Sequence, residues 1–396
     1  MHQQKQSFFR SLNRKDRYMI GNLFFLYLVQ GVFVLLIGSI LPMMKAEYQL
    51  DYQVGGWMIS AHSIGNLIAG LCAGLLPLVF GLKRSLLCLN TLPFIGFAIT
   101  LITGNPILLI FALLLTGLGR GAISNYDNQA VSSLSQGSST PLNALHGFFA
   151  IGAVSAPLIA LVCTRGGDSG WRYAVYIIIA LGVISMITSV FMDMSSISSE
   201  TSTSQSNSFA FLKERPYFYS VLIMFFYQCV EASVMGWMVS YYTDCGVVQA
   251  DSAQLLTSLL WVTILIGRFS CSALGAYMST KTMIRMLSTG IVIFLLILLV
   301  SHSLLPMLIG TIGLGLSLSG MYGTTVSNAG DVFGRYPLAM SLFIPLVSIG
   351  SIITPSIIGS IAQVTTMRLG MSVLLVPAVI LFVLALFNKG PQIAEK

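Results

Sequence analysis

The sequence predicts an all-α integral membrane protein, and three observations lead to this fold class. Only 8% of the 396 residues are charged, whereas 55% are hydrophobic. The mean hydropathy is +0.85. In an ordinary soluble domain roughly a quarter of all residues are charged, so the charged residues here are too few to cover a water-exposed surface. The third observation is a series of long apolar runs. Together these features exclude a cytosolic enzyme, a secreted domain and a nucleic-acid-binding protein.

Twelve apolar runs lie between charges and turn residues, each close to the roughly 20 residues that a membrane-spanning helix needs. The first is too long for a signal-peptide core and lacks a small-residue cleavage site, so we expect it to be retained. Connections as short as Gly104-Asn105 make neighbouring helices antiparallel. In order, the expected helices are 19–44, 54–80, 85–103, 106–132, 143–164, 172–192, 218–243, 252–278, 282–301, 304–328, 338–364 and 368–388.

The series divides in the middle of the chain, where a polar stretch rich in Ser and Thr separates six runs from six. Such a composition is typical of a flexible linker. We therefore predict five parts. They are a cytoplasmic N-terminal segment (1–18), a six-helix bundle (19–192), a cytoplasmic linker (193–217), a second six-helix bundle (218–388) and a cytoplasmic tail (389–396).

Glycine and proline patterns recur between the halves. Gly152 and Pro157 in the fifth run match Gly350 and Pro355 in the eleventh, at an offset of 198 residues, and two further glycine patterns recur at nearly this offset. Parallel repeats of six helices are the architecture of transporters that rock two bundles about a central site. The pattern therefore predicts two pseudo-symmetric bundles with a cavity between them.

The basic residues predict the orientation. If both termini are cytoplasmic, 14 of the 20 Lys and Arg residues lie on the cytoplasmic side, 4 lie outside and 2 lie within the apolar runs. Lys and Arg are enriched in cytoplasmic loops. We therefore expect a multi-pass protein of the inner or plasma membrane with both termini in the cytoplasm.

The first two runs carry recognisable sequence patterns. Residues 38–42 read Gly-x-x-Leu-Pro, and residues 55–57 read Gly-Gly-Trp. These patterns resemble the major facilitator superfamily. In that family the next loop usually reads Gly-x-x-x-Asp-Arg-x-Gly-Arg-Lys and forms a charge latch, whereas residues 74–84 keep the glycines and the basic end without the Asp-Arg core. The resemblance covers the whole chain and implies transport by alternating access.

Three further stretches carry a narrower resemblance. Residues 117–128 read Gly-x-Gly-x-Gly followed by an Asn, and residues 142–152 read Leu-Asn-x-x-His-x-x-Phe-x-x-Gly. Residues 226–237 read Phe-Tyr-x-x-x-Glu followed by Gly-Trp. These motifs are similar to those of the fucose/galactose/glucose–proton symporter branch of the superfamily. The branch has a carboxylate in the fourth helix where this chain has Ser124.

Four ionisable residues lie inside the apolar runs: Arg120, Asp127, Glu231 and Arg268. A charge at membrane depth costs at least roughly 2.5–3.5 kcal/mol, so each needs a partner or a wet cavity. Glu231 lies near the middle of its run, and we predict that it binds the coupling proton. The alternative is a structural ion pair with Arg268 or Arg120. Asp127 is a second predicted proton-coupling residue, with a solvated acid at the helix end as the alternative.

Polar residues in the first and fourth helix of each half predict a solute site. Amides and aromatic rings suit a sugar, because hydroxyls need donors and acceptors and the C–H faces stack on rings. For each amide the alternative is a hydrogen bond between helices. We assign Arg268, Asn143 and His146 to gating or structure. The predicted solute-binding residues are Gln30, Arg120, Asn125, Asn128, Tyr227, Gln228, Trp237, Tyr322 and Asn328.

Taken together, the sequence predicts a secondary active transporter, with proton-coupled uptake of a sugar or similar small polar solute as the leading hypothesis. The alternatives are a proton-antiport exporter of drugs or metabolites and an uncoupled facilitator. The sequence contains no nucleotide-binding glycine loop, zinc-ligand spacing or nucleophile elbow, so we expect no enzyme activity, cofactor or metal. The expected partners are the solute, a proton or sodium ion and the bilayer, with no nucleic acid. We expect a monomer.

Overall fold

The computed structural model describes residues 12–72, 75–135, 139–165, 167–194, 197, 209–275 and 277–388. These residues form helices joined by turns and contain no strand. Eleven helical stretches among them are long and apolar enough to cross a membrane. The predicted all-α fold of a multi-pass membrane protein is confirmed.

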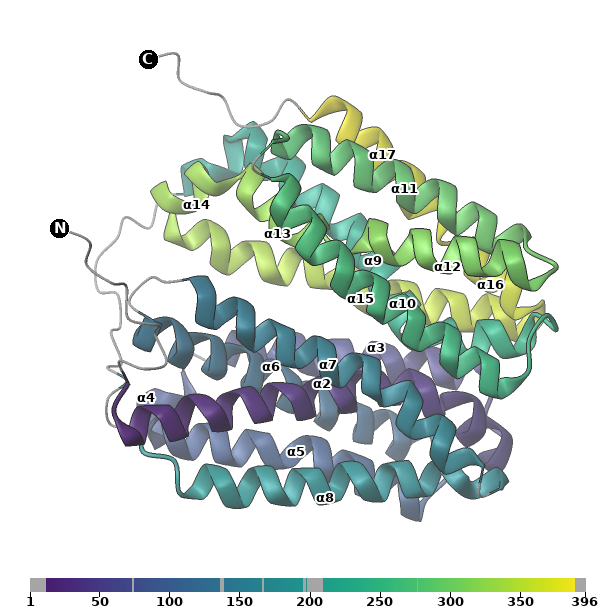
Figure 1. The fold of residues 1–396 in the computed structure, drawn as a ribbon, viewed down its shortest axis with the longest axis horizontal. Helices are drawn as coiled ribbons and strands as arrows, with labels where there is room; N and C mark the ends of the chain where they lie inside the picture. The colour runs from purple at the N-terminus through teal and green to yellow at the C-terminus, as the bar shows by residue number, and fades with distance from the viewer. Residues whose placement is uncertain are drawn as a thin grey trace. The chain divides into compact units, whose positions relative to one another are not determined.

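The first half of the chain contributes seven described α-helices and one short 3-10 helix (Figure 1). In Figure 1 they run from the purple α2 to the teal α8, and α5 packs along α6 and α8. Their bounds are α2 (Arg14–Tyr48), α3 (Tyr52–Cys72), α4 (Leu76–Phe80), α5 (Leu82–Ile102), α6 (Pro106–Ser135), α7 (Ser139–Thr164), η1 (Asp168–Gly170) and α8 (Trp171–Val190).

The second half is built around α9 (Arg215–Asp244), which packs against α10, α15 and α17. It begins with η2 (Phe209–Lys213), a short 3-10 helix that precedes α9. The other helices are α10 (Ala250–Leu274), α11 (Thr280–Val300), α12 (Leu304–Leu318), α13 (Met321–Asn328), α14 (Gly330–Arg335), α15 (Pro337–Val364), α16 (Met367–Ser372) and α17 (Leu375–Phe387).

Three expected helices correspond to two elements each, and one of these three is less apolar than the rest. The expected tenth helix, 304–328, is divided into α12 and α13 at Ser319-Gly320. Glycine is a poor helix former, and serine hydroxyls compete for backbone groups. The expected twelfth helix is also divided, into α16 and α17. The expected second helix corresponds to α3 and α4, and α3 is not among the eleven candidate spans because polar residues such as His62 and Asn66 lower its hydropathy.

The helices group into two compact units. Unit 1 comprises Met1–Leu36 and Ile64–Thr201, and unit 2 comprises Ile37–Ser63 and Ser202–Lys396. The C-terminal part of α2 and the N-terminal part of α3 therefore belong with the helices of the second half. We call residues 37–63 the hairpin segment.

Close backbone packing holds the hairpin segment in unit 2. A Cβ atom built on Gly56 would lie 2.7 Å from the carbonyl oxygen of Pro355 and 3.0 Å from the Cα of Ser356, so only glycine fits between α3 and α15. One turn further on, the Ser60 hydroxyl donates to the carbonyl of Ile352 at 2.5 Å and lies 2.6 Å from the Ser356 hydroxyl.

A polar cluster completes this packing at the turn between α2 and α3. Gln363 of α15 accepts a hydrogen bond from the Tyr52 amide at 2.8 Å and donates to Asp51 at 3.1 Å. The Tyr52 hydroxyl donates to Asp244 at the end of α9. The ammonium group of Lys45 lies 2.7 Å from the centre of the Tyr52 ring, a cation–π contact.

Equivalent glycines make equivalent contacts in the two halves. A Cβ on Gly152 of α7 would lie 2.8 Å from the Val32 nitrogen of α2. A Cβ on Gly350 of α15 would lie 3.2 Å from the Cys229 nitrogen of α9. In both cases the glycine lets the fifth helix of a half approach the backbone of its first helix, as small residues do in membrane bundles.

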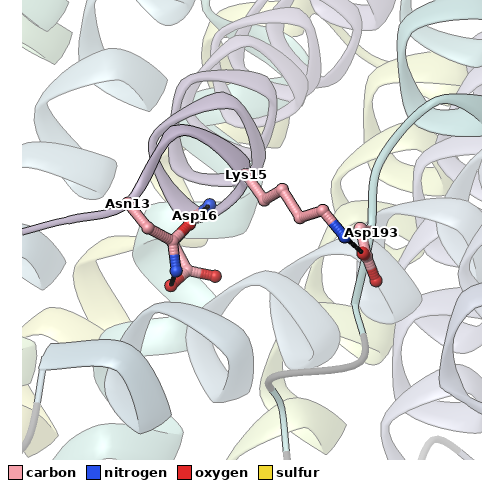
Figure 2. Close-up of polar contacts among 4 residues, drawn as sticks. All are labelled: Asn13, Lys15, Asp16 and Asp193. Atoms are coloured by element: carbon pink, nitrogen blue, oxygen red, sulfur yellow. Dashed lines mark hydrogen bonds and ion pairs between the residues drawn. The ribbon is translucent and has the colours of Figure 1, made fainter.

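The ends of the helices carry local polar contacts. At the start of α2, Asn13 accepts a hydrogen bond from the Asp16 amide at 2.8 Å and donates to the Asp16 carboxylate at 2.7 Å (Figure 2). The Lys15 ammonium also lies 2.9 Å from the carboxylate of Asp193, which follows α8 (Figure 2). Exposed ion pairs of this kind add little stability.

The expected linker, 193–217, falls largely outside the described residues, but its last part is described. In η2, the Phe211 ring is buried and lies 4.9 Å from the Tyr217 ring and 6.0 Å from the Tyr336 ring. Residues 209–216 therefore pack against the second half. The predicted tail, 389–396, lies outside the described residues.

The contact between Ser60 and Ser356 can be tested by cross-linking. With the six native cysteines replaced, Ser60→Cys combined with Ser356→Cys should form a disulfide, because the two hydroxyl oxygens lie 2.6 Å apart. After cleavage at a protease site introduced between the halves, the fragments should migrate together without reductant and separate with it. Ser60→Cys with Ser351→Cys is the control, since Ser351 bonds within its own helix. Equal cross-linking of both pairs would contradict this packing.

Candidate functional site

Two polar clusters contain most of the predicted site residues, one in each unit. In unit 1, the Gln30 amide of α2 donates to the Ser124 hydroxyl at 2.7 Å and to the Arg120 carbonyl at 3.2 Å, both in α6. One turn along α6, Asn128 donates to the Tyr27 hydroxyl at 2.7 Å. These bonds connect the first and fourth helices of the first half, two of the helices in which the sequence places solute ligands.

Asp127 is the most unusual residue of the unit 1 cluster. Its side chain is 0% exposed, and within the described part of the chain neither carboxyl oxygen has a hydrogen-bond partner. The predicted alternative for Asp127, a solvated acid at the helix end, does not fit this burial. A buried carboxylate without donors is strongly unfavourable, so the neutral acid fits this site best.

The other predicted residues of unit 1 lie closer to solvent. Asn125 is exposed, and its amide donates to the Gly121 carbonyl of its own helix at 2.7 Å. Asn143 and His146 of α7 are exposed. The His146 ring packs edge-on against Tyr27, with 5.4 Å between the ring centres. His146 therefore contacts the polar cluster through Tyr27.

In unit 2, Glu231 lies near the middle of α9 and is half-buried. The hydroxyl of Tyr227, one turn earlier, lies 2.7 Å from Glu231 Oε1 and 2.9 Å from the carbonyl oxygen of Leu318. Leu318 is the last residue of α12, where helical carbonyls lose their amide partners. The Tyr227 side chain thus connects the acid on α9 to the break in the tenth helix.

Two other predicted residues lie near the pair formed by Tyr227 and Glu231. Tyr322 of α13 interacts electrostatically with Glu231, and Arg268 of α10 interacts with Tyr227. Among the described residues of unit 2, no basic side chain forms an ion pair with Glu231, so the predicted alternative of a Glu231–Arg268 ion pair is not formed here. Gln228, the residue after Tyr227, is half-buried.

Trp237 and Asn328 lie in structural contacts. The Trp237 ring is fully buried, packs against the backbone of Gly55 and donates its indole N–H to the Pro355 carbonyl at 3.1 Å. The Asn328 amide exchanges hydrogen bonds with the Asn388 amide at 3.2 and 3.4 Å, and it also donates to Ser220 at 3.3 Å. Both side chains are thus occupied by neighbouring helices.

The arrangement has a counterpart among known proteins. The model of the Major Facilitator Superfamily matches residues 23–331. The chain belongs to the Major Facilitator Superfamily. The family resemblance read from the sequence is confirmed, and with it the prediction that the protein is a transporter and not an enzyme.

Individual members of the superfamily show how far the similarity extends. This chain is 23% identical to the glucose/mannose transporter GlcP of Bacillus subtilis over 383 residues, which cover 93% of each chain. It is 26% identical to the mouse major facilitator superfamily domain-containing protein 4A over 146 residues, which cover 36% of this chain and only 29% of the mouse protein.

Solved structures confirm the fold. A D-xylose–proton symporter superposes with a TM-score of 0.77 at 13% identity, and the superposition covers 94% of this chain and 97% of the symporter. The Escherichia coli fucose–proton symporter superposes with a TM-score of 0.64 at 18% identity, covering 95% and 100%.

Two members of these polar clusters were not predicted from the sequence. Tyr27 binds Asn128 and contacts His146. It lies three residues before Gln30 in the first helix, and this spacing could have indicated that the two side chains share a face. The Leu318 carbonyl is the second. A main-chain group has no residue type to reveal it, although the Ser-Leu-Ser-Gly sequence at 317–320 indicates a weak point in the helix.

The amide pair in unit 2 predicts non-additive effects on stability. Asn328→Ala leaves the Asn388 amide buried without its partner, and we expect each single alanine variant to cost about 1–3 kcal/mol. The double variant should cost little more than either single one, which thermal unfolding in detergent can measure. Weaker solute binding by Asn328→Ala at an unchanged melting temperature would instead support the ligand role predicted from the sequence.

Proposed function

We propose that this protein couples the uptake of a sugar, or a similar small polar solute, to the movement of a proton by alternating access. The observation that carries the proposal is Glu231, an acid near the middle of a membrane-spanning helix with a hydroxyl and no basic partner in its unit. The names of the related glucose/mannose transporter and of the structurally similar sugar–proton symporters support the solute class.

Glu231 has the properties that proton coupling requires. An ionised carboxylate in the membrane needs a partner or water, whereas the neutral acid tolerates a dry surrounding. Glu231 is half-buried, so its environment changes when water gains or loses access to it. Proton binding would then favour the conformation in which the acid is enclosed, and proton release would favour the open ones.

Asp127 is proposed as a second proton-binding group, in unit 1. The family motif that residues 117–128 resemble has a carboxylate at the position of Ser124, and here that hydroxyl instead accepts a hydrogen bond from Gln30. Asp127 is three residues away on the same helix and is fully buried without a hydrogen-bond partner among the described residues. It offers the one carboxyl of α6 that can take up a proton.

The proposed solute ligands are polar side chains that are at least partly exposed. In unit 1 these are Arg120, Asn125 and Asn128, with Gln30 holding the Arg120 backbone. In unit 2 they are Gln228 and Tyr322, the latter 46% exposed. Amides, a guanidinium and a phenol supply the donors and acceptors that sugar hydroxyls require.

We further propose that the protein is a monomer in the inner or plasma membrane with both termini in the cytoplasm. The distribution of Lys and Arg residues supports this orientation. The acidic sites need no metal or cofactor, because proton binding and conformational change supply the coupling.

Glu231→Gln tests proton coupling most directly, because the amide mimics a permanently protonated acid. In vesicles with an imposed proton gradient, this variant should lose the uphill accumulation of glucose, mannose, xylose or fucose, whichever the wild type transports. Exchange of labelled for unlabelled solute should persist, since it needs no net proton movement. Glu214→Gln is the matched control, because Glu214 pairs with Arg335 at 3.4 Å outside the apolar part of α9.

Three outcomes would change this proposal. Uphill accumulation by Glu231→Gln equal to that of the wild type would contradict the coupling role. Accumulation driven by a gradient of opposite sign would identify an exporter. If the wild type exchanges solute but never accumulates it under a proton gradient, the protein is an uncoupled facilitator. The Ser124 substitution in the family motif provides an argument for that alternative.

A further inference from the structure

The Tyr227 hydroxyl has one hydrogen atom and faces two acceptors. Glu231 Oε1 lies at 2.7 Å and the Leu318 carbonyl oxygen at 2.9 Å. A carbonyl oxygen can accept a hydrogen bond but cannot donate one. The protonation state of Glu231 therefore decides which of the two bonds Tyr227 makes.

When Glu231 is ionised, the three groups cannot all be satisfied. If Tyr227 donates to the carboxylate, the Leu318 carbonyl has no donor; if it donates to the carbonyl, its oxygen faces the carboxylate at 2.7 Å. When Glu231 carries a proton, the chain is complete. Glu231 donates to the Tyr227 oxygen, and Tyr227 donates to Leu318. The two observed distances place both acceptors within hydrogen-bond range of the same hydroxyl.

Leu318 lies at the break between α12 and α13. α12 ends at Leu318 and α13 begins at Met321, so the carbonyl has lost its helical amide donor. The Ser319-Gly320 pair between them packs against α10, where a Cβ on Gly320 would lie 2.8 Å from the Cys271 Cβ. On the α9 side, the Tyr227 hydroxyl donates to this break.

We propose that Tyr227 is a positioning residue that transmits the protonation state of Glu231 to the break between α12 and α13. The inference rests on the proposed proton coupling. On release, the Glu231 proton passes to water, and the Tyr227 hydroxyl turns from Leu318 to the new carboxylate. The Leu318 carbonyl then loses its donor, and the break loosens. Proton uptake reverses each step.

Other charged and titratable groups act on the same place from the adjoining helices. Arg268 of α10 interacts electrostatically with Tyr227 and favours a negative charge nearby. Tyr322 of α13 interacts electrostatically with Glu231 and lies on the segment that would move. Neither forms a hydrogen bond to Glu231 in the described structure, so Tyr227 is the group that connects the acid to the backbone.

Hydrogen exchange of the first turn of α13 tests this proposal. The Thr324 amide, which donates to the Gly320 carbonyl at 3.1 Å, reports on this turn. After correction for the intrinsic pH dependence, exchange in wild-type protein should accelerate as pH rises. In Glu231→Gln it should stay slow at every pH, because the glutamine amide donates permanently. In Tyr227→Phe it should be fast at every pH, roughly tenfold above Glu231→Gln, which corresponds to one lost hydrogen bond.

Tyr241→Phe is the matched control. Tyr241 lies on the same helix, is buried and donates to the Leu298 carbonyl at 2.8 Å, so it loses the same kind of bond far from Glu231 along the helix. It should keep the pH dependence of the wild type. Tyr227→Phe with a wild-type pH dependence would overturn the proposal. If Tyr227→Phe does not fold, equal pH dependence in wild type and Glu231→Gln would overturn it.

These outcomes are separable from those that test transport itself. If Glu231→Gln loses uphill accumulation but Tyr227→Phe keeps the pH-dependent exchange of the wild type, proton coupling stands and the role of Tyr227 fails. If Glu231→Gln accumulates solute like the wild type, the coupling role of Glu231 fails whatever the exchange pattern shows.

Discussion

A polar group inside a bilayer has no water to bind, so it must find its partner within the protein. This constraint determines the organisation of both units. In unit 1 it joins the Gln30 amide to Ser124 across α2 and α6. In unit 2 it pairs Asn328 with Asn388 and places the Tyr227 hydroxyl between an acid and a helix end. Asp127, which lacks such a partner in the described structure, is for that reason a functional candidate.

The helix α9 shows the constraint most clearly. Four of its tyrosines carry apolar rings into the core of unit 2 and place their hydroxyls on neighbouring helices. Tyr217 donates to the Ala339 carbonyl of α15, Tyr241 donates to the Leu298 carbonyl of α11, and the Tyr242 hydroxyl lies 2.5 Å from that of Thr311 in α12. Tyr227 differs from these three because one of its two partners can change protonation state. A set of structural bonds thus includes one that can switch.

The hairpin segment follows a different rule, close backbone contact through glycine. Gly56 approaches α15 too closely for any side chain, and Gln363 satisfies the polar groups of the adjoining turn. The Gly-Gly-Trp sequence at 55–57, noted in the sequence for its family resemblance, therefore has a packing role in unit 2.

The sequence predicted the helices well because hydropathy and turn residues act locally. The spacing of Tyr227 and Glu231 in the Phe-Tyr-x-x-x-Glu motif also agrees with their contact, since residues four apart on a helix are neighbours. It could not show that Asn328 bonds to Asn388, because that partner lies 60 residues further along the chain. Likewise, nothing local to Trp237 indicates that its indole binds the Pro355 carbonyl. The function of a polar membrane residue depends on which helix faces it, and that is a property of the tertiary structure.

The central claim, that Glu231 binds a proton and, when protonated, donates a hydrogen bond to Tyr227, can be measured directly by infrared difference spectroscopy of the protein in lipid vesicles. Subtracting the Glu231→Gln spectrum from that of the wild type isolates the Glu231 carboxyl. We expect a carbonyl band of a protonated, hydrogen-bonded acid, which shifts in Tyr227→Phe and converts to carboxylate bands as pH rises. Carboxylate bands alone across the whole pH range in which the protein transports solute would contradict the claim.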